Sequence, residues 1–171
     1  MSTQTSHSEL NKQTVFVVDD EPDVRAALRL LIKSVGYTVE CFESADQFLD
    51  QFDTDHKGCL ILDVRMPGMS GMDLQEKLSE LNALLPIIMI SGHGEIPMAV
   101  KAVQNGAIDF LQKPFSDQQL LDRITQALEL NSTLHETHEV KHAAQEKYDS
   151  LTPREIEIFS EVVSVKLNIV I

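Results

Sequence analysis

The chain has 171 residues, of which 43% are hydrophobic and 24% are charged, and its formal net charge at pH 7 is -13. This size excludes a large multidomain enzyme, and the composition is typical of a globular protein and not of a disordered or fibrous one. Because a strongly negative chain repels phosphate backbones, nucleic-acid binding would require a local basic element. No apolar run has the length of a membrane span or the pattern of a signal peptide, so we expect a cytoplasmic protein without membrane contact.

Five strand-like apolar runs alternate with five helical patterns after a polar leader, residues 1–13, which we expect to be flexible. The predicted strands are Thr14–Val18, Tyr37–Phe42, Cys59–Leu62, Pro86–Ile90 and Ile108–Gln112. The predicted helices start near Pro22, Ser44, Gly71, Ile96 and Ser116. Because parallel strands need a crossover to return the chain, this alternation predicts an α/β fold with a parallel sheet that is buried on both faces.

The apolar pattern weakens after Leu130, and we expect residues 131–150 to form a linker helix. The run Thr152-Pro153-Arg154-Glu155 has the pattern of a capping box, which predicts one more helix. The apolar C-terminal end of this predicted helix would favour aggregation if it were exposed, so we expect it to pack against another surface. Three histidines in this region lack a zinc-protease motif and are expected on a solvated face: His135, His138 and His142.

Polar side chains follow four of the predicted strands. They are Asp19 and Asp20 after the first strand, and Asp63, Ser91 and Lys113 after the third, fourth and fifth. In open parallel sheets the carboxyl ends of strands border one crevice, so we expect these groups to lie together. Three neighbouring carboxylates repel one another unless a cation neutralises them, and oxygen ligands favour Mg²⁺. Lys113 adds an ammonium and Ser91 a hydroxyl, and both groups can bind phosphate oxygens. The set is therefore typical of a phosphoryl-transfer site.

Other functions on the same sheet topology stay open at this point. A magnesium-dependent aspartyl phosphatase would have Asp-x-Asp after the first strand, whereas Asp19 and Asp20 are adjacent. A flavin-binding protein would have a Ser-, Thr- or Gly-rich loop there, and an acidic loop repels phosphate. A dimerisation or adaptor module that acts without phosphorylation would not need the intact polar set. Cys41 and Cys59 have no second thiol or histidine at metal-ligand spacing and are expected to be buried free thiols.

Four motifs in order resemble the receiver domain of two-component response regulators: Val17-Val18-Asp19-Asp20-Glu21, Leu62–Gly71, Ser91-Gly92-His93-Gly94 and Lys113-Pro114-Phe115. The resemblance covers residues 14–130 and implies a flavodoxin-like (CheY-like) fold with five βα units. It implies that Asp63 accepts a phosphoryl group from a sensor histidine kinase. It also implies that Mg²⁺ or Mn²⁺ binds to Asp19, Asp20, Asp63 and the main-chain carbonyl of Arg65.

The same resemblance implies a conformational switch. Lys113 would pair with the acyl phosphate, the Ser91 hydroxyl would move inward, and Phe110 would turn toward the interior. The Lys113–Pro114 peptide bond would be cis, as is typical of the family. The signal would reach a face that commonly forms homodimers in this family, here Val100, Val103, Gln104, Asp109 and Leu111. Such a protein is not an enzyme, although it assists its own phosphorylation and dephosphorylation.

The region around Thr152 resembles the opening of a LuxR-type helix-turn-helix domain, and Lys166-Leu167-Asn168 resembles the entry to its second helix. Together they indicate the FixJ-like branch, in which a linker helix joins the receiver to a DNA-binding domain that regulates transcription. About one helix follows Thr152, so we expect residues 151–171 to be an incomplete start of that domain. DNA would then be bound only through a complete output domain that is absent from this chain. A truncated or engineered form and a natural short regulator whose tail docks or dimerises both stay open.

Overall fold

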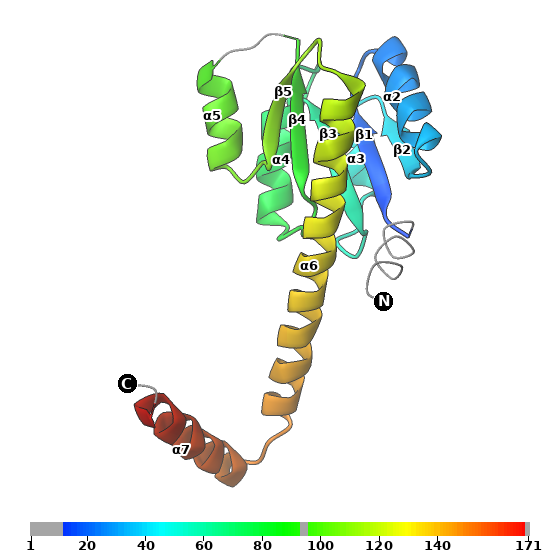
Figure 1. Cartoon of the computed structure of the whole chain (residues 1–171). Coiled ribbons are helices and arrows are strands. Elements are labelled where there is room, and N and C mark those ends of the chain that lie inside the picture. The colour runs from blue at the N-terminus through cyan, green and yellow to red at the C-terminus, as the bar shows by residue number, and fades with distance from the viewer. Residues whose placement is uncertain (1–11, 93–95, 170–171) are drawn as a thin grey trace. The chain divides into compact units, whose positions relative to one another are not determined.

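The computed structural model describes residues 12–92 and 96–169, with side chains up to Leu167. The chain divides into two compact units, one that ends at Leu134 and one that starts at His135. The first unit contains a parallel sheet with the strand order β2-β1-β3-β4-β5 (Figure 1). The strands are β1 (Thr14–Val18), β2 (Thr38–Phe42), β3 (Gly58–Asp63), β4 (Ile87–Ser91) and β5 (Asp109–Gln112). The predicted five-stranded parallel α/β fold is therefore confirmed.

Helices cover both faces of this sheet (Figure 1). One face packs against α2 (Pro22–Ser34) and the first part of α6 (Asp117–Asp149). The other face packs against α3 (Ala45–Gln51), α4 (Gly71–Glu80) and α5 (Ile96–Gln104). Because each central strand is buried on two sides, it consists almost entirely of apolar residues, as the unbroken apolar runs predict.

The helix ends follow from local sequence signals. Pro22 occupies the first turn of α2, where its missing N–H costs no hydrogen bond. At the start of α4, Ser70 and Asp73 form a capping box. Beyond the end of α5, Gly106 has a φ of 103°, a left-handed conformation that glycine adopts without steric cost.

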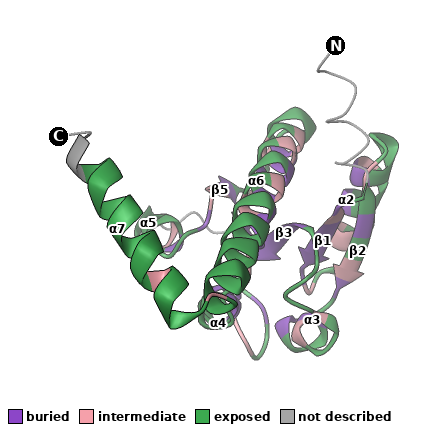
Figure 2. Cartoon of the chain, turned by 90° about the horizontal axis from the view of Figure 1, so that it is seen from below, coloured by how far each residue is buried: buried purple, intermediate pink, exposed green. Residues whose placement is uncertain are grey.

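The predicted boundary at residue 130 is not a break in secondary structure, because α6 runs through it as one helix. Every side chain in residues 136–149 is exposed (Figure 2). His138 and His142 are exposed as expected, but the expectation for His135 is wrong, because its side chain is buried. The physical reason is helical spacing, since His135 lies one turn beyond the fully buried Asn131 on the same helix face.

Helix α7 (Pro153–Ile169) belongs to the second unit and starts at the predicted capping box. The Thr152 main-chain N–H donates to Glu155 Oε2 at 2.7 Å, and the Glu155 N–H donates to Thr152 Oγ1 at 3.4 Å. Figure 2 shows that most of α7 is exposed. Six of its described apolar side chains are 40–63% exposed: Ile158, Phe159, Val162, Val163, Val165 and Leu167. The side chains of Ile169, Val170 and Ile171 lie outside the described residues, so the packing expected for this end stays a prediction.

The two cysteines are free. Cys59 is buried in β3, and burial raises the pKa of its thiol. Cys41 is only partly buried, which corrects the expectation for this residue. It lies on β2, an edge strand, where the sheet is less completely covered. None of the described helices has the length and the apolar composition needed to cross a membrane.

A buried amide ties α6 to the amino ends of the strands. Asn131 Oδ1 accepts hydrogen bonds from Gln13 Nε2 at 2.8 Å and from the Gly58 main-chain N–H at 2.9 Å. Asn131 Nδ2 donates to the Leu84 carbonyl at 2.9 Å. Of the predicted flexible leader only Lys12 and Gln13 are described, and Gln13 is instead buried and held by these bonds.

We predict that Asn131→Leu lowers the free energy of unfolding by about 2–4 kcal/mol, because it leaves the buried Gly58 N–H and Leu84 carbonyl without partners. Urea denaturation followed by circular dichroism measures this change. The matched control is Glu129→Leu, an exposed position on the same helix, for which we expect a change within about 0.5 kcal/mol. Equal stability of Asn131→Leu and the wild type would contradict the importance of this network.

Candidate functional site

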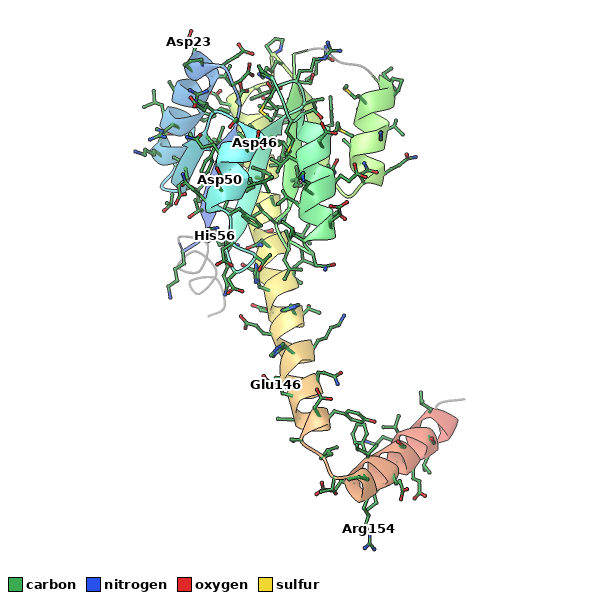
Figure 3. The ribbon with its side chains drawn as sticks, turned by 180° about the vertical axis from the view of Figure 1, so that it is seen from behind. Asp23, Asp46, Asp50, His56, Glu146 and Arg154 are labelled. Carbon is green, nitrogen blue, oxygen red and sulfur yellow. The ribbon has the colours of Figure 1, made fainter. Side chains whose placement is uncertain are left out.

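Three carboxylates meet where the strand order reverses. Asp19 and Asp20 directly follow β1, and Asp63 ends the neighbouring strand β3. Asp19 is fully buried, Asp63 is 4% exposed, and ligand oxygens of all three residues lie within 4.8 Å of one another. Asp23 lies in the first turn of α2, which follows β1, and His56 precedes β3. Figure 3 shows these two residues at opposite ends of the first unit. The carboxylates lie at the Asp23 end, as the strand-end rule predicts.

Lys113, from the loop after β5, is the cation at this cluster. Its Nζ lies 3.0 Å from Asp19 Oδ2 and 3.6 Å from Glu21 Oε1. Arg25 Nη1 donates to the Asp19 main-chain carbonyl at 2.7 Å. The contacts of Glu21 and Arg25 were not predicted from the sequence. Glu21 could have been found as the third acid of an unbroken acidic run, but no pattern marks Arg25.

The charges in the cluster are reflected in the pKa of Asp63. Burial, followed by the negative charge of Asp19, raises the pKa of this carboxyl from 3.8 to about 6. The positive charge of Lys113 and a hydrogen bond from the Arg65 main-chain N–H act in the opposite direction, and Asp20 raises the pKa further. The ionised form of Asp63 is thus destabilised, and an added cation would stabilise it.

The same carboxylates act on Lys113. Burial lowers the pKa of its ammonium, but the hydrogen bond and charge of Asp19 and the charges of Asp63 and Glu21 outweigh burial and raise it overall. Lys113 is therefore charged at neutral pH. The Lys113–Pro114 peptide bond is cis, as the family resemblance implies.

Main-chain contacts hold the neighbouring strand ends in place. The Lys113 N–H donates to the Ser91 carbonyl at 2.8 Å, and Ser91 is buried at the end of β4. The Gly71 N–H donates to the Val64 carbonyl at 2.9 Å, and a Cβ at Gly71 would lie only 2.1 Å from the Asp63 main-chain oxygen. Glycine is therefore required where α4 approaches Asp63. The motif residues His93 and Gly94 lie outside the described residues.

The predicted dimer face is mostly accessible. Val100 and Val103 on α5 are 49% and 51% exposed, and Gln104 is also exposed. Asp109, at the start of β5, forms an ion pair with Arg123 of α6. These four predicted residues therefore lie at or near the surface.

Phe110 and Leu111, which follow Asp109 in β5, lie in different environments. Phe110 is partly buried and packs against the core on the side of α5. Leu111 is 3% exposed and belongs to the core on the side of α2 and α6, so its assignment to the dimer face is wrong. The reason is that α6 covers the side of β5 on which Leu111 lies, where Leu120 and Ile124 belong to the same core.

Comparison with known proteins matches residues 15–125 to the response regulator receiver domain. The chain is 44% identical over 166 residues to the response regulator protein TodT of Pseudomonas putida, a match that covers 97% of this chain and 73% of that protein. It is 34% identical over 153 residues to the transcriptional regulatory protein FixJ of Bradyrhizobium diazoefficiens, covering 90% of this chain and 75% of that one.

A solved structure, that of the response regulator StyR, resembles the present one with a TM-score of 0.83 and 46% sequence identity. The similarity covers 90% of this chain and 77% of the StyR chain. These relatives are named as regulators and not as enzymes. The chain belongs to the response regulator receiver family.

Proposed function

We propose that the chain is a two-component response regulator in which Asp63 accepts a phosphoryl group from a sensor histidine kinase. The observation that carries this proposal is the convergence of Asp19, Asp20 and Asp63 within 4.8 Å, with the Lys113 ammonium beside them. A carboxylate can act as the nucleophile, and a fixed ammonium can stabilise negative charge on the transferred group. Membership of the receiver family supports the same function.

In the proposed reaction an oxygen of Asp63 attacks the phosphorus of a phosphohistidine in line with the P–N bond. The new O–P bond forms as the P–N bond breaks, and its electron pair remains on the imidazole nitrogen. Lys113, now 3.0 Å from Asp19, would share its charge with the phosphoryl oxygens. The Ser91 hydroxyl would donate a hydrogen bond to one of those oxygens.

The donor set fits Mg²⁺ or Mn²⁺. It consists only of oxygen ligands, which hard divalent cations prefer, and the pKa of Asp63 is raised first by burial and then by negative charge that a cation would offset. Asp19, Asp20 and Asp63 would hold the ion together with the main-chain carbonyl of Arg65. When bound, the ion balances the charge of the carboxylates and of the transferred phosphoryl group.

The proposed output of the receiver is a change in self-association. Inward movement of Ser91 would make room for Phe110, which is partly buried next to the core. The homodimer face would then contain Val100, Val103, Gln104 and Asp109, without Leu111. Half-exposed valines on one helix are the feature that supports this part of the proposal.

We extend the proposal to three regions: a receiver domain at 14–130, a linker helix at 131–150, and a segment of a LuxR-type helix-turn-helix output domain at 151–171. The capping box that starts α7 and the match to FixJ over 90% of this chain support the assignment. Control of transcription and contact with DNA would belong to that output domain. The strongly negative charge of the chain argues against DNA binding by the receiver.

We predict that incubation with acetyl phosphate and Mg²⁺ adds one phosphoryl group to the wild type, detected by intact mass and removed by hydroxylamine. Asp63→Asn should abolish this addition because it removes the nucleophile. The matched control Asp50→Asn, at an exposed site on α3, should be modified like the wild type. Absence of modification in the wild type would contradict the proposal and favour an adaptor that acts without phosphorylation.

We predict that Asp63→Asn increases the free energy of unfolding at pH 7 in a chelator by about 1–3 kcal/mol, because it removes a destabilised buried charge. The pKa of Asp63 is about 6 in the folded protein and near 3.8 when unperturbed. Folding therefore favours the protonated carboxyl. The destabilisation of the wild type by ionised Asp63 is absent below pH 3.8, grows as the pH rises, and is complete above about pH 6.

Urea denaturation of both proteins between about pH 4 and pH 8 measures this difference. Added Mg²⁺ should stabilise the wild type more than Asp63→Asn and so narrow the gap at pH 7. A stability difference that does not depend on pH would show that the buried charge of Asp63 is not its cause.

A further inference from the structure

Helix α5, which carries most of the proposed dimer face, has few apolar anchors. Of its described residues only Ala102 is buried, and it contributes a single methyl group, while Met98 is partly buried against the same core. Ile96 is 78% exposed, and the valines of this helix are about half exposed. Because burial stabilises in proportion to apolar area, hydrophobic packing alone holds α5 weakly against the sheet.

A buried amide from the neighbouring helix supplies a second attachment. Gln75 of α4 is 2% exposed, and its Nε2 donates to the Ala102 carbonyl at 2.8 Å. The same carbonyl accepts the Ala107 N–H at 3.0 Å, in the turn that ends α5. The two helices lie side by side in opposite views (Figures 1 and 3). Gln75 therefore binds α5 at the residue whose side chain is its one buried anchor.

This attachment is not fully satisfied. Gln75 Oε1 is buried and has no hydrogen-bond partner among the described residues. A buried acceptor without a partner destabilises the arrangement that contains it, whereas the bond from Nε2 stabilises it. A displacement of α5 would break the stabilising bond from Nε2, and it would allow the unpaired Oε1 to find a partner. These opposing effects are typical of an element with two accessible positions.

The start of α4 lies against the backbone of Asp63. Gly71 starts the helix at a point where a Cβ would lie 2.1 Å from the Asp63 main-chain oxygen, and its N–H donates to the Val64 carbonyl. Gln75 lies one turn further along, on the same side of the helix. A single short helix therefore connects the candidate phosphoacceptor with the end of α5.

We infer that Gln75 is a positioning residue that latches α5 to α4 and couples the position of α5 to the backbone at Asp63. The latch follows from the geometry of Gln75 and Ala102. The coupling rests on the proposed phosphorylation of Asp63 and adds a route to α5 beside the one through Ser91 and Phe110. It makes α4 part of the switch, although no residue of α4 contacts the carboxylates in the described hydrogen bonds and ion pairs.

Hydrogen exchange of the full, unmodified chain tests the latch. Gln75→Met keeps the side-chain length and removes both the donor and the unpaired acceptor, so we expect amides of α5 to exchange at least tenfold faster, with β-sheet amides unchanged. Glu76→Met, at an exposed position on the same helix, is the matched control and should behave like the wild type. Unchanged exchange in α5, or equally faster exchange throughout the first unit, would overturn the latch. Gln75→Leu provides a second variant if the methionine does not fit.

Phosphorylation with acetyl phosphate and Mg²⁺ tests the coupling. Phosphorylated wild type should show altered exchange in α5, and in Gln75→Met this difference should shrink by at least half at equal phosphate incorporation. A difference as large as in the wild type would overturn the coupling. If intact mass shows no phosphate in the wild type, the proposed function and the coupling both fail, whereas the latch is decided by the unmodified proteins alone.

Discussion

Repulsion among three carboxylates at the ends of β1 and β3 is the constraint on which the site depends. Asp19 and Asp63 are buried, and the pKa of Asp63 rises to about 6, first because burial removes water from its charge and then because the nearby charge of Asp19 is poorly screened. A core that served stability alone would place apolar residues there. The parallel topology brings these groups together because β1 and β3 are neighbours at the point where the strand order reverses. Destabilised charges at such an edge are typical of functional sites.

Lys113 connects this repulsion to the rest of the sheet. It comes from β5 at the edge of the sheet, yet its ammonium pairs with Asp19 at the end of β1, and its main chain is bonded to Ser91 of β4. One residue thus links three strand ends, and its ammonium balances the charge of Asp19. Negative charge added at Asp63 would compete with Asp19 for Lys113, and that competition gives the proposed switch a physical origin.

Much of this architecture follows from sequence pattern. Pro22 and Ser44 mark helix starts, alternating elements predict the parallel sheet, and strand-end carboxylates predict the acidic cluster. Leu111 was misplaced because α6 covers its side of β5, and the position of that helix over the strand cannot be read from the strand's own sequence. Helix α6 continues beyond residue 130 because extending an existing helix is far easier than starting one.

Buried amides are the features that pattern could not predict. Asn131 and Gln75 are polar residues in helices, and a polar residue is ordinarily assigned to the solvated face. Their burial depends on partners distant in sequence, such as the Gly58 N–H and the Ala102 carbonyl, whose positions arise only once the sheet has formed. Gln75 attaches α5 where apolar contacts are few, and Asn131 attaches α6 where its buried part ends.

The most direct test of the account is a titration of the Asp63 carboxyl carbon by NMR, first in a chelator and then with Mg²⁺. Burial together with carboxylate repulsion predicts a pKa for Asp63 near 6 in the metal-free protein, and a shift to lower pH when the cation is added. A pKa near 3.8 that Mg²⁺ does not move would contradict the claim that unbalanced negative charge defines this site.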